Sequence, residues 1–393
     1  MKDFWKEPPT QKLNKKRITI FIIILIIIIN TITITIIYVK NKDFREWIDT
    51  TILRKEVNQD QLATIEVKEE DNPQIQAFNQ YIAILSKNEL KLYNNSGKEE
   101  KKLSVEISNP IFNSQGRYLV VGENKGQKIY CITDKDIAWE QTVEGNISQV
   151  HVSQNGYVAI TIVDTTYKTM ISVYNQKGEL QFNQYLSSTR VSDVAISNDN
   201  KYLAMAEIDT SGIVIESKIE VISIEKAKTD PNNSKIAAYT FENNELITNI
   251  EYQDKGRLIC MSKDKITKIS LEGEKEELSN NESKKTTFQS IELNNTVVTL
   301  EEKASSLFTA DSIATIINTE NKNTVNYTTQ AVTKELYTYE NIIALNLGTE
   351  IEFINTGGWL VKRYKAEQEI TDITLSGNLA GIIYRDKIEI VNL

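Results

Sequence analysis

The 393-residue chain has the length of two or three ordinary domains, or of one closed β-propeller. Its composition, 40% hydrophobic and 25% charged, is that of a globular protein, and abundant Ile and Thr favour strands. The net charge of −9 argues against nucleic acid as a partner, because that binding rests on Lys and Arg displacing phosphate counterions, and two cysteines are too few for a disulfide framework.

The chain begins with a basic tail, residues 1–17, which carries six Lys or Arg side chains and two acidic ones. Residues 18–39 follow without a charge. A helix of that length spans about 33 Å, enough to cross a hydrocarbon core of about 30 Å. A cleavable signal peptide is the alternative, but its apolar core would be only about 7 to 15 residues long, and no Ala-x-Ala-like site precedes Lys40. We therefore predict a retained signal anchor, a single transmembrane helix at residues 18–39.

The basic side chains also predict the orientation of this helix. Six precede it, whereas Lys40, Lys42 and Arg45 follow it closely. By the positive-inside rule the tail stays in the cytoplasm, and the rest of the chain lies outside the cell membrane.

Polar side chains within the span could join two such helices by hydrogen bonds. Asn30 and Thr33, and Thr31 and Thr35, have the spacing of neighbours on one helical face. We expect instead that each Thr bonds to its own preceding turn and that Asn30 reaches water or a lipid headgroup.

Residues 40–61 are predicted to form a juxtamembrane helix and linker. Within 43–57, an amphipathic helix would place Phe44, Trp47 and Ile48 on one face.

A repeat of about 43 residues follows, in which short apolar runs come after turn-forming residues. The eight runs lie at 82–85, 119–122, 158–161, 203–206, 258–261, 297–300, 342–345 and 380–383. This spacing is typical of a four-stranded propeller blade, and runs that are apolar throughout are typical of strands covered on both faces. We predict an all-β, eight-bladed propeller over residues 62–393. In the seven-bladed alternative, the run at 297–300 would be an insertion.

The last repeat ends after three strands and therefore lacks a fourth. Residues 62–67, Leu-Ala-Thr-Ile-Glu-Val, form an unassigned strand before the first repeat. Pairing it with the strand at 387–392 would close the ring and cover an exposed edge.

The stretch at 196–206, Ile-Ser-Asn-Asp-Asn-Lys-Tyr-Leu-Ala-Met-Ala, resembles the repeats of WD40-like and quinoprotein-like propellers. Residues 135–140 with 145–147 are similar to a quinoprotein-like blade junction. The whole layout resembles a bacterial family of membrane-anchored propellers whose domain has no assigned function, so the resemblance implies a topology and no chemistry. Quinoprotein enzymes carry a Trp in most blades, whereas only Trp139 and Trp359 lie in the repeats, which argues against a quinone cofactor.

Motifs for catalysis or metal binding are missing from the sequence. The single histidine, His151, alternates within a strand pattern near a turn, which favours a structural role over a catalytic one. Cys131 and Cys260 lie in apolar strand runs of non-adjacent repeats and are expected to be buried free thiols. We therefore predict no catalytic, cofactor or metal residues.

Paired carboxylates remain possible, because glycosidases act through two of them. The candidates are Asp164, Asp193, Glu207 and Asp209, which the sequence cannot pair across blades. Asp199 and Asp254 lie in turn sequences and are expected to shape those turns.

These features favour a non-enzymatic, membrane-tethered propeller that binds a protein or cell-envelope component. Two alternatives stay open. One is a glycan hydrolase or lyase with paired carboxylates, which a tight acidic cluster at the central funnel with raised carboxyl pKa values would favour. The other is a sensor or assembly factor that acts through the transmembrane helix.

Overall fold

The structure is a computed structural model that describes residues 15–53, 55–57, 62–241, 245–253, 256–270, 273–281, 286–304 and 310–393. The chain forms two compact units, Met1–Glu56 and Val57–Leu393. Most of the predicted basic tail, residues 1–17, lies outside the described residues.

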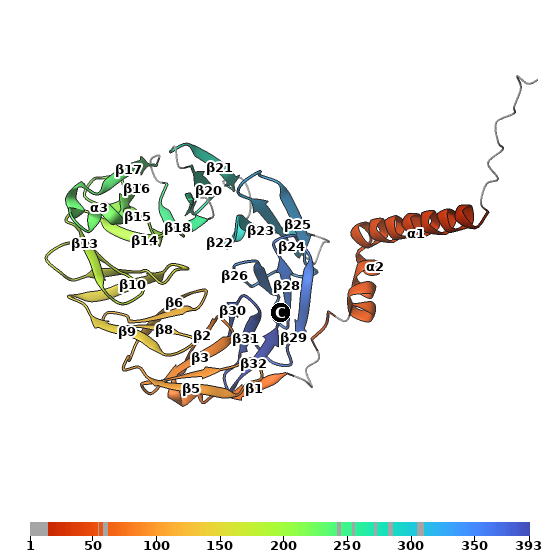
Figure 1. The fold of residues 1–393 in the computed structure, drawn as a ribbon, viewed down its shortest axis with the longest axis horizontal. Helices are drawn as coiled ribbons and strands as arrows, with labels where there is room; N and C mark the ends of the chain where they lie inside the picture. Colours follow the sequence, from red (N-terminus) through yellow and green to blue (C-terminus); the bar gives the residue numbers. More distant parts are fainter. Residues whose placement is uncertain are drawn as a thin grey trace, which may run out of the picture. The chain divides into compact units, whose positions relative to one another are not determined.

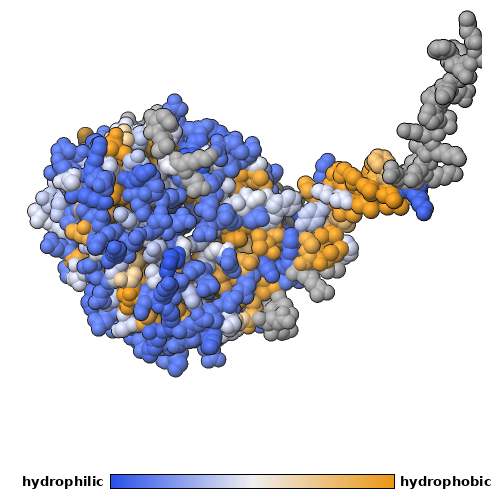
Figure 2. Space-filling view, viewed as in Figure 1, coloured by the Kyte–Doolittle hydropathy of each residue, from blue (hydrophilic) through white to orange (hydrophobic). Residues whose placement is uncertain are grey.

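The first unit is helical. It contains α1 (Lys15–Lys40), α2 (Lys42–Trp47) and the π-helix η1 (Ile48–Ile52). The segment Thr19–Lys40 of α1 is the one described helix that is long and apolar enough to cross a membrane, and Figure 2 shows the hydrophobic residues that dominate α1. Asn41 begins α2 by accepting a hydrogen bond from the Phe44 amide. The amphipathic helix expected at 43–57 is therefore shorter, because the chain changes to π-helical geometry at Ile48.

The polar side chains of α1 bond within their own helix. Thr31, Thr33 and Thr35 each donate to the carbonyl four residues earlier, as expected. Asn30 also donates to its own helix, to the Ile26 carbonyl at 2.8 Å, and the expected water or headgroup contact stays a prediction. The Asn side chain reaches the preceding turn as the Thr hydroxyls do.

The second unit is an eight-bladed propeller, as predicted, in which every blade is a four-stranded antiparallel sheet (Figure 1). The first four blades are numbered in chain order. Their strands are, in blade 1, β2 (Gln74–Phe78), β3 (Tyr81–Ser86), β4 (Glu89–Tyr93) and β5 (Glu99–Ser104); in blade 2, β6 (Pro110–Gln115), β7 (Tyr118–Glu123), β8 (Lys128–Thr133) and β9 (Ile137–Thr142); in blade 3, β10 (Asn146–Val152), β11 (Val158–Val163), β12 (Thr169–Tyr174) and β13 (Leu180–Leu186); and in blade 4, β14 (Arg190–Ile196), β15 (Tyr202–Asp209), β16 (Glu216–Ser223) and β17 (Lys235–Thr240).

The remaining blades follow the same order except the last, which draws on both ends of the propeller sequence. Their strands are, in blade 5, β18 (Ile247–Gln253), β19 (Arg257–Ser262), β20 (Lys265–Ile269) and β21 (Lys275–Asn280); in blade 6, β22 (Thr286–Leu293), β23 (Thr296–Ala304), β24 (Ala310–Asn318) and β25 (Thr324–Thr328); in blade 7, β26 (Glu335–Tyr339), β27 (Ile342–Asn346), β28 (Glu350–Asn355) and β29 (Leu360–Lys365); and in blade 8, β30 (Asp372–Ser376), β31 (Leu379–Ile383), β32 (Lys387–Asn392) and β1 (Ala63–Glu66). Short helical turns also occur at η3 (Glu69–Asp71), α3 (Ile224–Ala227) and η4 (Pro231–Asn233).

The N-terminal strand closes the ring as the sequence predicted. β1 pairs antiparallel with β32, with Ala63 opposite Ile390 and Glu66 opposite Lys387. Ile65, only 5% exposed, packs in one core with Ile388 and Ile390. The run at 297–300 lies in β23, the second strand of a complete blade, so the seven-bladed alternative was wrong.

The hydrophobic core lies between neighbouring blades. In β7, Val120 belongs to the core shared with blade 3, whereas Leu119 and Val121 belong to the core shared with blade 1. Successive side chains of a strand point to opposite faces, so a second strand covered by a blade on each side must be apolar at every position. Burial also explains the thiols: Cys131 and Cys260 are free and buried, and desolvation raises the pKa of Cys131 to about 12.

Candidate functional site: the central channel

The innermost strand of each blade faces the axis of the ring, where the structure has a cavity of about 900 Å³. We call this cavity the channel. Side chains from β2, β6, β10, β14, β18, β22, β26 and β30 line it. The lining is rich in carboxamides, hydroxyls and carboxylates, and none of the described lining residues is Lys or Arg.

Polar side chains join the innermost strands of blades 2, 3, 4 and 8 to the next blade. Thr374 accepts from the Ala77 amide at 2.6 Å, Asn113 from Val152 at 2.7 Å and Asp193 from Ile250 at 2.8 Å. We call these residues, together with His151, the bridging acceptors. They satisfy backbone donors that would otherwise have no partner at the edge of an innermost strand.

His151 occupies the same position in blade 3. Its Nε2 accepts from the Ile196 amide at 3.4 Å, which requires a neutral ring at that nitrogen. Burial lowers the pKa of His151 to about 4, which keeps the ring neutral near pH 7. The geometry therefore gives His151 a structural part between blades 3 and 4, although it also lines the channel.

Four carboxylates line the channel, all from blades 4 to 7. These channel carboxylates are Asp193 in β14, Glu251 in β18, Glu292 in β22 and Glu340 in the turn after β26. Burial raises the pKa of Asp193 to about 7, against the opposing effect of two backbone N–H donors. Burial also raises the pKa of Glu251 well above its ordinary range, and the charges of Glu292 and Asp193 raise it further.

Glu251 and Glu292 lie on the innermost strands of the neighbouring blades 5 and 6. Glu292 remains accessible to water in the channel, yet protein encircles it, so desolvation raises its pKa and that of Glu340. No hydrogen bond or ion pair from another described residue reaches the carboxylates of Glu251 or Glu292. These groups are the ones that a ligand in the channel would meet.

β-Bulges set which side chains reach the channel. In blades 3 to 6 the pairing of the first two strands shifts near its start, for example between Val191 and Asp193 and between Ile247 and Asn249. A bulge re-aims the residues that follow it. Asp193 and Asn249 come directly after such shifts and both line the channel.

The structure separates the carboxylates that the sequence singled out. Among them only Asp193 lines the channel. Glu207 and Asp209 lie at the C-terminal end of β15, the second strand of blade 4, and Asp164 accepts from Asn146 in a turn after β11. They do not form a pair with Asp193.

Two other expectations concern turn residues. Asp199 accepts from the Lys201 amide and from the Ser197 hydroxyl, and so shapes the turn between β14 and β15. Asp254 lies outside the described residues.

Sequence reasoning missed Glu251, Glu292 and Glu340. The available signal was their position, because each lies within a few residues before the turn that leads to an apolar run. That position predicts that a residue lies on or directly after an innermost strand. It does not predict whether the side chain faces the channel or packs between two blades.

Two further features concern possible metal ligands and the tryptophan side chains. Among the described residues, no group of three or more His, Cys, Asp or Glu side chains is placed to hold a metal ion. Trp139 lies in the outer strand β9, stacked on Tyr174, and Trp359 is 49% exposed before β29. Neither lines the channel.

Comparison with known proteins gives one family. A model described as a family of unknown function, DUF5711, matches residues 53–393, which include all eight blades. The chain belongs to DUF5711. No curated protein matches the sequence.

Solved propellers share the fold of this DUF5711 protein. A eukaryotic initiation factor is 13% identical with a TM-score of 0.52, over 82% of this chain and 85% of that one. Dihydro-heme d1 dehydrogenase NirN in complex with DHE is 12% identical with a TM-score of 0.51, over 86% and 72%. BamB from Moraxella catarrhalis is 14% identical with a TM-score of 0.49, over 85% and 99%. Identities this low bear on the fold alone.

Proposed function

We propose that this protein is a membrane-tethered, extracytoplasmic propeller that binds a protein or cell-envelope component in its channel without catalysing a reaction. The channel carries the proposal. It has a volume of about 900 Å³, and its described lining combines four carboxylates with many carboxamides and hydroxyls but no Lys or Arg. Such a surface favours a ligand that donates hydrogen bonds or carries positive charge.

The tether rests on α1 and on the charges around it. α1 provides 22 residues that can span a bilayer, and the basic side chains number six before the predicted span and three shortly after it. We propose that the N-terminus is cytoplasmic and that the propeller is held outside the cell membrane. A C-terminal tag should then be digested by protease added to intact protoplasts, and a protected tag would refute this orientation.

The second candidate, a glycan hydrolase or lyase, has one observation in its favour. Asp193, Glu251 and Glu292 lie in one cavity, and each has a raised pKa. Glycoside hydrolysis, however, needs carboxyls in opposite states, one protonated as the acid and one ionised as the nucleophile or base. Here the pKa shifts of all the channel carboxylates share one direction, and Asp193 already bonds two backbone amides. Binding therefore accounts for the site better than hydrolysis.

The third alternative, a sensor or assembly factor that acts through the transmembrane helix, has no observation in its favour among the described residues. Asn30 and the three Thr side chains bond to their own helix, so none of them calls for a partner helix.

The experiment is a crosslinking capture from intact membranes with a photoreactive residue at Gln154, which lies at the mouth of the channel, and a matched one at Lys177 on the outer rim. We expect an adduct from Gln154 that the additional substitution Glu251→Lys abolishes, and none from Lys177. Equal adducts at both positions would refute channel binding. Hydrolysis of cell-wall glycan by the wild type but not by Glu251→Gln would establish the enzyme instead.

A further inference from the structure

The hairpin of β15 and β16 ends in an exposed apolar tip. Both strands are 8 residues long, and their pairing extends to Asp209 opposite Glu216. The six residues between them, Thr-Ser-Gly-Ile-Val-Ile, carry no charge. Ile213, Val214 and Ile215 are 106%, 42% and 51% exposed. Three adjacent aliphatic side chains in water are costly unless something covers them.

Other exposed apolar side chains lie at the same edge of blades 3 to 5. Tyr167, in the loop between β11 and β12, contacts Tyr185 with ring centroids 4.6 Å apart. Leu246 directly precedes β18. In an antiparallel meander, the connection from the second to the third strand and the connection into the next blade lie at one edge of the sheet. We call Tyr167, Tyr185, Leu246 and the three residues 213–215 the apolar rim.

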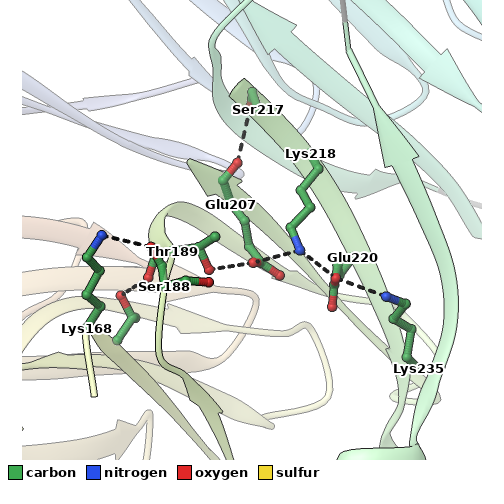
Figure 3. Close-up of polar contacts among 9 residues, drawn as sticks. Lys168, Ser188, Thr189, Glu207, Ser217, Lys218, Glu220 and Lys235 are labelled. Atoms are coloured by element: carbon green, nitrogen blue, oxygen red, sulfur yellow. Dashed lines mark hydrogen bonds and ion pairs between the residues drawn. The ribbon is translucent and has the colours of Figure 1, made fainter. Parts of the chain in front are cut away.

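A network of buried polar contacts holds the base of the rim (Figure 3). Glu207, at 1% exposure, accepts from Thr189 at 2.6 Å and pairs with Lys218 at 3.3 Å. Ser217 bonds to the Glu207 carbonyl and accepts from the Ile247 amide, which joins blade 4 to blade 5.

The same base extends toward blade 3. Lys168, next to Tyr167, donates to the Ser188 carbonyl at 2.8 Å, one residue before Thr189. Bonds on both sides thus fix the base of the hairpin, so the apolar tip projects from a supported stem and does not fold back onto the sheet.

The position of the rim in the ring points to its partner. The chain enters the propeller through β1 in blade 8, and blade 4 is four blades away in either direction around the ring of eight (Figure 1). The chain meets the propeller at Val57, whose amide donates to the Arg363 carbonyl of blade 7. Residues 41–56 before it include the helices α2 and η1 and therefore span at most about 35 Å, which keeps a bilayer spanned by α1 close to the propeller. The rim projects from the propeller, and a fluid bilayer can accept a projecting apolar tip without a groove of matching shape. Tyrosine side chains beside aliphatic ones are typical of the membrane interface.

We propose that the apolar rim inserts into the surface of the lipid bilayer that anchors the chain, giving the propeller a second membrane contact opposite its tether. The inference rests on the proposed membrane tether. Two contacts on opposite sides of the ring would hold the disc at one inclination and direct one mouth of the channel away from the lipid.

The test uses the full-length chain in nanodiscs that contain nitroxide-labelled phospholipid. A fluorophore is attached at Val214→Cys or, as the control, at Asn95→Cys in an exposed turn at the opposite edge of blade 1. The native Cys131 and Cys260 are buried, so labelling is selective for the introduced cysteine. We expect at least about threefold stronger quenching at Val214→Cys than at Asn95→Cys, and loss of that difference when Ile213→Asp is added.

Each other outcome overturns the proposal. Equal quenching at the two positions, with the chain incorporated in nanodiscs, would refute the rim contact and leave the tether intact. Failure of the chain to incorporate would refute the tether and the rim contact together. A fluorophore at Val214→Cys that stays unquenched in nanodiscs but is shielded in native membranes would identify a protein as the partner of the rim.

Discussion

The two halves of the channel use polar side chains differently. In blades 8, 1, 2 and 3 the lining has no carboxylate, and Thr374, Asn113 and His151 each accept a backbone hydrogen bond from the next blade. In blades 4 to 7 only Asp193 does so, whereas no described residue bonds the carboxylates of Glu251 and Glu292. We call these the uncharged half and the acidic half. The difference separates groups that hold the ring together from groups that remain for a ligand.

The largest expected effect comes from breaking the ring in the uncharged half. Ile65→Asp would place a charge in the core between blades 8 and 1, and we expect it to lower the free energy of unfolding by about 3 to 5 kcal/mol. The matched variant Ile65→Val should cost about 0.5 to 1.5 kcal/mol. Denaturant titration of the full-length chain, followed by tryptophan fluorescence, to which buried Trp139 contributes, measures both. Similar costs for the two variants would show that β1 is dispensable for closure.

The acidic half should dominate binding. Glu251→Gln together with Glu292→Gln removes two ionisable carboxyls without changing the shape of the side chains, and we expect the partner captured at Gln154 to bind at least about tenfold more weakly. Gln115→Ala, in the uncharged half, should change the affinity less than about twofold, because no ionisable group is removed. Quantitative crosslinking against protein concentration gives both values. A larger loss from Gln115→Ala would reverse the assignment of the two halves.

His151 should matter to stability and not to binding. His151→Ala leaves the Ile196 amide without its acceptor, and we expect a cost of about 1 to 2 kcal/mol in unfolding free energy. Partner capture by the folded variant should equal that of the wild type. A folded His151→Ala protein that no longer captures its partner would show that this histidine takes part in binding and not only in holding the blades together.

Asp193 and His151 should also give opposite pH dependences. The pKa of Asp193 is raised to about 7, so the folded state holds the extra proton and stability falls as pH rises from about 4 to about 7. The pKa of His151 is lowered to about 4 from an ordinary value of about 6.5, so stability rises with pH over about 4 to 6.5. Glu251 and Glu292 act in the same direction as Asp193.

Single substitutions separate the two slopes. Relative to the wild type, Asp193→Asn should make unfolding free energy rise more with pH, and His151→Ala should make it fall more, each by at most about 1.4 kcal/mol per pH unit. Thermal unfolding between pH 4 and 7 measures the differences. Parallel curves for the wild type and both variants would contradict the pKa shifts.

The sequence predicted the ring better than the site. The apolar runs and the strand at 62–67 identified the eight blades and the closure, because a strand covered on both faces is apolar at every position and an open edge needs a partner. The channel carboxylates are different. Whether Glu251 faces the channel depends on a bulge after Ile247 and on the curvature of the whole ring, which no local pattern in the chain expresses.

Asp193 also shows what the sequence could not predict, which is the set of carboxylates that share one cavity. It was among the candidate carboxylates, but the sequence could not pair it with Glu251 and Glu292, because three separate blades bring these residues to one cavity. Glu207 and Asp209 lie in the second strand of the same blade, and Ala206 next to Glu207 is directly opposite Asp193, yet neither carboxylate lines the channel. Closeness within one blade therefore does not place a carboxylate in the channel, because the side chain must also come from the innermost strand.

The most direct test of the central claim, that the acidic half of the channel binds the partner, is crosslinking from inside the channel in intact membranes. One photoreactive residue replaces Asn249 in the acidic half and another replaces Gln115 in the uncharged half; both positions line the cavity. We expect a partner adduct from position 249 at several times the yield from position 115. Equal yields from the two positions, or no adduct from either, would contradict the account.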